Sequence, residues 1–180
     1  MYPFIRLVWQ VVKHRRDARL PLTGTHVSTH YCLPWDIDLW WELNNGRTLT
    51  IFDLGRIPLA QRVGLIDVLR EKGWGLTVAG SVVRYRRRVR MFDRIEMRSR
   101  ATCWDERFVY VEQSMWKRNG ECSSHALLRM AVTGKNGIVP PGEVMAALGR
   151  GDESPEMPEW IARWIAAEDA RPWPPMQDAD

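Results

Sequence analysis

The sequence predicts an α+β domain in which an antiparallel sheet wraps one buried helix. Residues 45–56 carry apolar side chains that point in nearly all directions from a helix, and such a helix is a buried one. From Gly75 onward the apolar period changes to two, which predicts strands at 75–91, 94–103, 107–117 and 121–133. With 180 residues, 45% of them hydrophobic, the chain has the length of one globular domain with a sizeable core.

The first predicted element is an amphipathic helix at residues 2–14. One face carries Arg6, Gln10 and Lys13, and the other carries Phe4, Leu7, Val8, Val11 and Val12. We interpret it as a helix packed on its own domain. The alternative is a membrane-surface anchor at residues 2–16, because basic residues follow the apolar ones. We favour the packed helix.

A strand at 25–33 follows and ends at Pro34, which makes five strands in all. A tryptophan-rich polar loop then leads to Asn44, a good N-cap for the buried helix. Pro58 ends or kinks that helix, and a second helix runs to about Lys72, where Gly73 can stop it.

Reversals between the later strands are predicted at Asp93, at 104–106 and at Asn119-Gly120, and Asn-Gly is the strongest short hairpin signal. Short helices are expected near 142–149 and 156–169, followed by a loose proline-rich and acidic end at 171–180. We divide the chain into an N-terminal helix at 1–22, a sheet-and-helix domain at 23–139 and a helical tail at 140–180.

Composition limits the function classes without selecting one. The net charge of +4 and pI near 9.2 permit an anionic ligand such as a phosphorylated cofactor. Cys32, Cys103 and Cys122 are scattered and odd in number, so neither a disulfide framework nor a zinc site is indicated. No apolar run has the length of a membrane span. The apolar N-terminus precedes its basic residues, the reverse of a signal peptide, so we expect a cytoplasmic protein.

Three carboxylates, those of Asp36, Asp38 and Glu42, lie just before the start of the buried helix. The free N–H groups of a helix start can hold a developing oxyanion, and a carboxylate can attack or activate water. This pattern favours hydrolysis of an acyl group, although acids near a helix start are also ordinary capping. We expect Trp35, Trp40 and Trp41 to surround these acids with apolar surface.

These residues resemble the hotdog-fold thioesterases. The segment Asp36-Ile37-Asp38, then Asn44-Asn45, then Asp53 and Arg56 is similar to their DxD, NN and (D/E)xxR pattern. The block at 82–95 is similar to the strand and turn that follow their helix. The likeness spans about 24–139 and is closest to 4-hydroxybenzoyl-CoA-thioesterase-like proteins. It implies a hotdog fold, with the five-stranded antiparallel sheet around the central helix. The N-terminal helix and the C-terminal helical tail fall outside the likeness and are expected as additions to that fold.

The resemblance implies a homodimer, or a dimer of such dimers, that hydrolyses an acyl-CoA thioester. Asp38 corresponds to the catalytic carboxylate, and the position of a family histidine holds Glu42, which we expect to substitute as base. The carbonyl is expected to bind near the backbone of Asn44, Asn45, Gly46 and Arg47. Asp53 matches a family position on the helix, where we favour a buried partner for Arg56 over a role in the reaction.

A row of arginines alternates along the strand predicted at 75–91. Arg84, Arg86 and Arg88, continued by Arg90, either form a solvated outer face or bind the phosphates of CoA. Tyr85 is expected on the opposite face, so the basic face lacks the interleaved aromatics of a nucleic-acid site, and we expect no nucleic acid.

His26, His30 and Cys32 share a strand face, but they are widely spaced and lack a fourth ligand, so we expect no metal and no cofactor. The sequence thus predicts an acyl-CoA thioesterase. The alternative is a hotdog domain that binds acyl-CoA or a protein without turnover.

Overall fold

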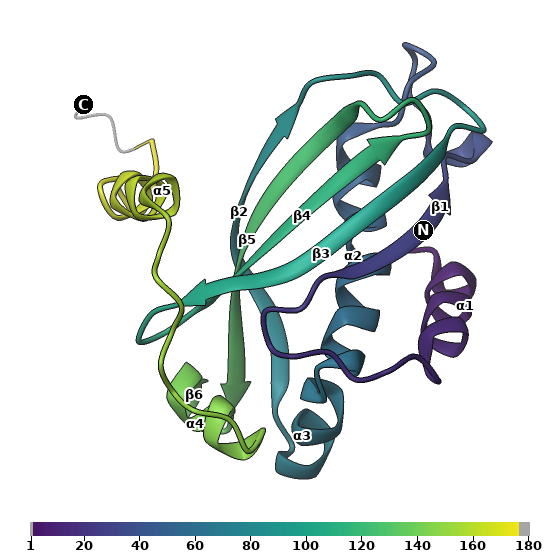
Figure 1. The fold of residues 1–180 in the computed structure, drawn as a ribbon. Helices are drawn as coiled ribbons and strands as arrows, with labels where there is room; N and C mark the ends of the chain where they lie inside the picture. The colour runs from purple at the N-terminus through teal and green to yellow at the C-terminus, as the bar shows by residue number, and fades with distance from the viewer. Residues whose placement is uncertain (1, 177–180) are drawn as a thin grey trace.

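The computed structural model describes residues 2–176, which form a curled antiparallel sheet around one long helix (Figure 1). The strands are β1 (His26–Tyr31), β2 (Gly75–Tyr85), β3 (Arg94–Trp104), β4 (Val109–Lys117), β5 (Cys122–Gly134) and β6 (Gly137–Val139). Their order in the sheet is β1-β3-β4-β5-β2, and β6 pairs with the end of β5. β1 and β2 are therefore at opposite edges, although the chain visits them first.

The long helix α2 (Asn45–Arg62) lies along the concave face of the sheet (Figure 1). Ile51, Phe52 and Leu54 are fully buried, as predicted for a helix that is apolar on all sides. α2 approaches β3 so closely at Gly55 that a Cβ there would overlap the sulfur of Met97. The close contact explains why a residue without a side chain is needed in the middle of a helix.

α2 does not end at Pro58, as one of the two predicted outcomes had it, because the helix continues through Pro58 to Arg62. Proline removes one backbone donor, but the packing of the buried residues around Pro58 holds the last turn in place. The next helix, α3 (Leu65–Lys72), ends at Gly73 in the left-handed conformation, as predicted.

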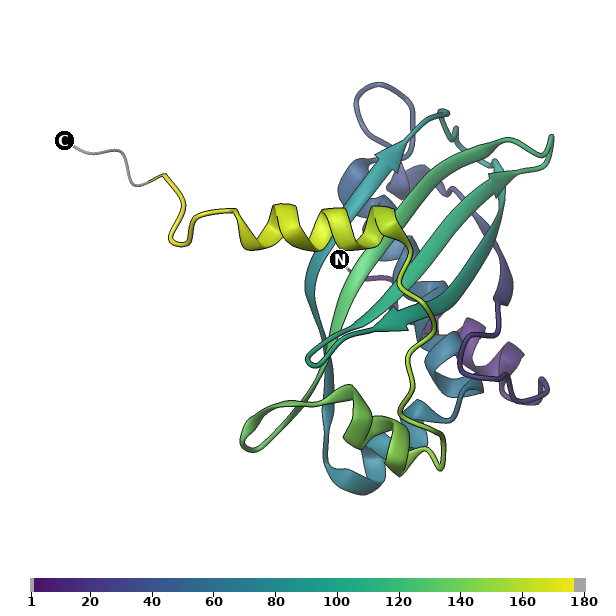
Figure 2. The ribbon, with the colours of Figure 1, turned by 60° about the vertical axis from the view of Figure 1, so that its left-hand side comes forward.

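Two C-terminal helices pack against parts of the sheet. α4 (Pro141–Ala147) closes one end of the core, and α5 (Glu159–Asp169) begins against the outer face of the sheet and extends away from it (Figure 2). Ile161 of α5 is fully buried against Tyr110 and Leu127 of the sheet. Of the end predicted to be loose, residues 177–180 lie outside the described part of the chain. The division into three segments stays a prediction.

The N-terminal helix α1 (Phe4–His14) packs against α2 and bonds to the edge of β1, but not through the face that the sequence suggested. Its buried residues are polar, Gln10 and His14, whereas Phe4, Val8 and Val12 are exposed. The helix packs on its own domain, as expected, but its inner side is formed by these polar residues together with the half-buried Leu7 and Val11. No helix in the described chain is long and apolar enough to cross a membrane.

β2 ends at Tyr85 rather than at residue 91. The amides of Arg86 and Arg87 both donate to the carbonyl of Ser123 instead of continuing the ladder. The alternation of faces therefore stops, and the arginines from Arg84 to Arg90 do not form the single row predicted. The turn at Asn119-Gly120 is confirmed, with Gly120 at a positive φ of 83°.

Candidate active site

The loop before α2 folds back on itself and brings the acidic residues to the helix start. The amide of Asn44 donates to the carbonyl of Asp36 (2.9 Å), and the amide of Asp38 donates to the carbonyl of Glu42 (2.9 Å). Ile37 and Leu43 form a β-bridge between these two bonds. Asp38 and Glu42 thus lie opposite each other in this short antiparallel pairing, which leads into the first turn of α2.

Asn44 caps α2 as predicted. Its Oδ1 accepts from the amides of Gly46 (2.9 Å) and Arg47 (3.2 Å), and its carbonyl accepts from the amide of Thr48. Among the described residues, the amide of Asn45 is left without an acceptor at this helix start. The expected oxyanion site at residues 45–47 is therefore narrowed to Asn45, because the side chain of Asn44 occupies the next two amides.

Asp36 is fully buried and holds two elements together. Its Oδ2 accepts from Nη1 of Arg6 in α1 (2.6 Å) and from the amide of Leu33 (3.1 Å), and its Oδ1 accepts from Nη2 (2.8 Å) and Nε (3.1 Å) of Arg47 in α2. These are the contacts of a structural carboxylate. The catalytic role predicted for Asp36 stays a prediction, and these contacts do not support it.

Asp38 is half-buried at the base of the loop tip. Its Oδ1 accepts from the amide of Trp40 (2.8 Å). The three tryptophans expected to surround the acids do not cover them, because Trp35, Trp40 and Trp41 are all exposed. Asp38 therefore faces a more solvated surface than the sequence suggested.

Glu42 lines a pocket of about 190 Å³ between the start of α2 and the end of β2. The lining residues come from three parts of the fold, and they are Glu42, Leu43, Asn45, Thr48, Tyr85, Arg86, Arg87, Arg88, Val89 and Ser124. Oε2 of Glu42 lies 2.9 Å from Nε of Arg88 as an ion pair. That oxygen is buried and accepts no aligned hydrogen bond within the described chain, so it keeps its capacity to accept one.

The pocket brings together some predicted site residues and omits others. Arg86 and Arg88 line it, whereas Arg84 lies in the ladder opposite His125. Tyr85, expected on the far face, instead points its hydroxyl at the carbonyl of Asn45 (3.5 Å), and burial raises its pKa. Sequence reasoning missed Tyr85, Thr48 and Ser124, because the end of β2 leaves no signal in the apolar pattern.

Asp53 is a partner of Arg56, the role favoured from the sequence over a role in the reaction. It forms an ion pair with Arg56 one turn along α2, and Nη1 of Arg56 also donates to Oε1 of the buried Gln113 (3.0 Å). The side-chain Nε2 of Gln113 donates to Oγ of Ser99 (2.8 Å) and to the carbonyl of Phe52 (2.9 Å). This buried network fixes α2 to β3 and β4.

The two histidines of β1 form hydrogen bonds with side chains of the same domain. Nδ1 of His26 lies 3.1 Å from the guanidinium of Arg62, and Nε2 of His30 lies 2.8 Å from the hydroxyl of Ser28. Burial lowers the pKa of His26 to about 4 and that of His30 to about 3. Among the described residues, no three His, Cys, Asp or Glu side chains are grouped as a metal site.

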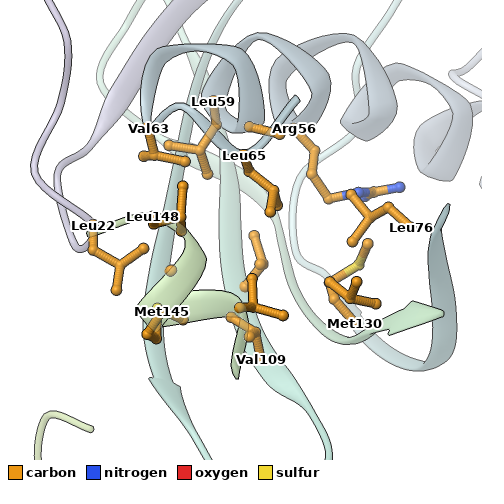
Figure 3. Close-up of a pocket in the computed structure, with 15 residues that line it drawn as sticks. Leu22, Arg56, Leu59, Val63, Leu65, Leu76, Val109, Met130, Met145 and Leu148 are labelled. Carbon is orange, nitrogen blue, oxygen red and sulfur yellow. The ribbon is translucent and has the colours of Figure 1, made fainter. Parts of the chain in front are cut away.

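A second void lies deeper in the core, between the last turns of α2, the sheet and α4 (Figure 3). It measures about 60 Å³ and its lining is apolar apart from Arg56. Arg56 follows Asn45 by eleven residues, which is about 16 Å along a helix. This cavity therefore contributes no group to chemistry at the start of α2.

Comparison with known proteins identifies the family. The family model described as "Thioesterase-like superfamily" matches residues 32–165, most of the chain. The chain belongs to this superfamily. Protein THEM6 of Xenopus laevis is similar, with 33% identity over 169 residues that cover 93% of this chain and 80% of the relative.

Similar solved structures agree with the fold. The probable thioesterase YbaW of Escherichia coli has a TM-score of 0.64 and 15% identity, covering 71% of this chain and 99% of its own. A hypothetical protein of Staphylococcus aureus, solved in complex with CoA, has a TM-score of 0.56 and 13% identity. The match covers 83% of this chain and 87% of the Staphylococcus aureus chain. At these identities the likeness concerns the fold, and the predicted hotdog fold is confirmed.

Proposed function

We propose that the chain hydrolyses an acyl-CoA thioester to the free acid and CoA in the pocket at the start of α2. Membership of the thioesterase-like superfamily supports thioester hydrolysis in general terms. The observation that carries the finer proposal is the composition of the pocket. It combines the carboxylate of Glu42, the unbonded amide of Asn45 and the three consecutive arginines 86–88.

In the proposed reaction the thioester carbonyl lies against the first turn of α2. The amide of Asn45 and the positive end of the helix dipole stabilise the oxyanion. Glu42 takes a proton from water as the water adds to the carbonyl carbon, and the carbon–sulfur bond then breaks as the CoA thiolate leaves and is protonated. Asp38, across the loop from Glu42, is the alternative base or nucleophile that the family resemblance implies.

The arginines are proposed to hold the phosphates of CoA, since a guanidinium matches phosphate oxygens bidentately. A phosphate bound to Arg88 would compete with Glu42 for the same guanidinium and release the carboxylate for the reaction. The CoA complex of the similar Staphylococcus aureus protein supports a coenzyme ligand for this fold.

A homodimer is proposed to complete the site. β2 is an edge strand of eleven residues with mostly exposed side chains, and an unpaired edge of that length is a template for another strand. Tyr85, at the end of β2, lines the pocket. A partner strand paired with β2 would therefore lie beside the site.

The proposal is tested by measuring thiol release from short, long and aromatic acyl-CoAs by the purified chain. We expect turnover of at least one class. Arg86→Ala should raise KM about tenfold for acyl-CoA but not for the matching acyl-pantetheine, which lacks the phosphoadenosine. Arg150→Ala, at an exposed site away from the pocket, is the control.

The rival function is a hotdog domain that binds acyl-CoA without turnover. Saturable binding with no thiol release for short, long or aromatic acyl-CoAs would refute hydrolysis and support this rival function. A chain that neither binds acyl-CoA nor releases thiol would refute both functions.

A further inference from the structure

Helix α1 is turned with its apolar side outward. Its inner side carries Arg6, Gln10 and His14, which are directed at the domain, with Leu7 and Val11 half-buried beside them. Its outer side is formed by large apolar residues with high exposed fractions, namely Phe4 (66%), Ile5 (88%), Val8 (60%), Trp9 (64%) and Val12 (51%). At 100° per residue these five positions span an arc of about 140° on the helix.

The inner contacts explain this orientation. β1 is an edge strand, and its outward carbonyls need donors. Nε2 of Gln10 donates to the carbonyl of Thr29 (3.1 Å), and Nη2 of Arg6 donates to the carbonyl of Tyr31 (2.8 Å). Arg6 also binds the buried Asp36. Because the polar side of α1 satisfies the edge of the sheet, the apolar side is left facing away from the domain.

Within the described residues, no other element covers this apolar face. α1 lies at the β1 edge of the sheet, and β2, the edge proposed for the dimer, is on the opposite side (Figure 1). A homodimer through β2 would therefore leave α1 exposed. Contiguous apolar surface of this kind marks an interaction site, whereas scattered apolar residues do not.

The surroundings of the face are basic. Lys13, Arg15 and Arg16 are exposed at the end of α1, and in the described part of the chain none of them has an acidic partner. An open groove of about 690 Å³ runs beside α1 to the loop after β4. Its lining includes Arg6, Trp9, Lys13, Tyr31, Arg94 and Arg118. The partner of the apolar face should therefore carry negative charge at its border.

We propose that α1 binds the surface of a lipid bilayer that contains anionic lipids. Its eleven residues are about 16 Å long, too short to span a bilayer, so the helix lies in the interface with its apolar face inserted. Trp9 and Tyr31 occupy the headgroup level, where aromatic side chains with a polar atom concentrate in membrane proteins. The basic residues bind lipid phosphates. The sequence alone did not favour this alternative, because it did not reveal which face of the helix packs.

The test is flotation of the purified chain with phosphatidylcholine vesicles containing about 30% phosphatidylglycerol, against vesicles of phosphatidylcholine alone. We expect binding that is at least tenfold stronger with the anionic lipid and that weakens in high salt. The triple variant Ile5→Ser, Val8→Ser, Trp9→Ser should lose at least tenfold in binding. These three side chains are exposed, so the fold is retained, which circular dichroism checks.

Two control variants match the test. Trp173→Ala with Met176→Ala removes equally exposed apolar groups elsewhere, and should bind vesicles as the unmodified chain does. Charge reversal to glutamate at Lys13, Arg15 and Arg16 should abolish the preference for anionic lipid, whereas reversal at Lys72, Lys135 and Arg150 should reduce it far less.

Two results would overturn the proposal. One is an absence of vesicle binding, or binding that the triple variant retains. The other is a self-associated chain, seen by sedimentation equilibrium, that the triple variant reduces to a smaller species. The second result would assign the α1 face to another copy of the chain.

Discussion

Replacing Asp36 by asparagine tests the buried ion pairs that fasten α1 to α2. The change removes the negative charge that faces both Arg6 and Arg47, while keeping the size of the side chain. Removing one partner of a fully buried pair costs about 3–5 kcal/mol. The two arginines are 19% and 20% exposed, so water can solvate them in part, and we expect a loss of about 2–4 kcal/mol.

A matched control lies elsewhere in the same chain. Asp67 and Arg19 form an ion pair of the same length, 2.6 Å, but their side chains are 60% and 62% exposed. Exposed pairs contribute roughly 0–1 kcal/mol. For a chain of this size, 1 kcal/mol shifts Tm by about 2–4 °C. Thermal unfolding should therefore show a drop of about 4–16 °C for Asp36→Asn and at most about 4 °C for Asp67→Asn. Equal shifts in the two variants would refute the structural role of Asp36.

Three further predictions concern packing, pH and assembly. Gly55→Ala should destabilise the chain by about 1–2 kcal/mol in urea unfolding, despite a gain of about 1 kcal/mol in helix propensity, because the new methyl meets the buried Met97; a stabilised variant would contradict this close contact. His26 has its pKa lowered to about 4, so between pH 6.5 and 4 the unfolded chain binds a proton that the folded chain does not. The contribution of His26 to stability should be full above pH 6.5 and fall by up to ~3 kcal/mol toward pH 4, with His30 adding a loss of the same sign, and His26→Gln should lose less over that range; parallel curves would exclude a contribution from His26. Val78→Lys with Val82→Lys, both on the edge strand β2, should shift the proposed dimer to monomer in sedimentation equilibrium, and an unchanged dimer would exclude pairing through β2.

Local signals in the sequence were enough to predict much of the fold. Asn44 caps α2 through its own side chain, Gly73 stops α3 with a positive φ, and Asn119-Gly120 turns the chain between β4 and β5. Each of these depends on residues within a few positions of one another. The helix at 45–56 was predicted to be buried because its own apolar pattern leaves no solvated side.

The errors arose where a distant partner decides the outcome. The end of β2 depends on Ser123, whose carbonyl captures the amides of Arg86 and Arg87, and nothing near residue 85 signals it. Pro58 was expected to interrupt a helix that tertiary packing carries through to Arg62. For the same reason, the amphipathic pattern of α1 could not reveal that its polar side would pair with the edge of β1.

The candidate site was predictable in place but not in the roles of its residues. Asp36 and Glu42 were correctly located beside the start of α2, whereas Asp38 does not line the pocket there. Which of them is free depends on partners far away in sequence. Arg6 engages Asp36 from another helix, and the end of β2 forms the pocket around Glu42.

The most direct test of the proposed reaction centre is kcat/KM for thiol release, measured for Glu42→Gln with an acyl-CoA that the unmodified chain hydrolyses. Asp38→Asn tests the alternative base, and Glu71→Gln, an exposed acid of α3, is the control. We predict a loss of at least about a hundredfold for Glu42→Gln and an unchanged value for Glu71→Gln, since positioned acid–base groups contribute about 10²–10⁴. Full activity in both Glu42→Gln and Asp38→Asn would contradict a reaction centre at the start of α2.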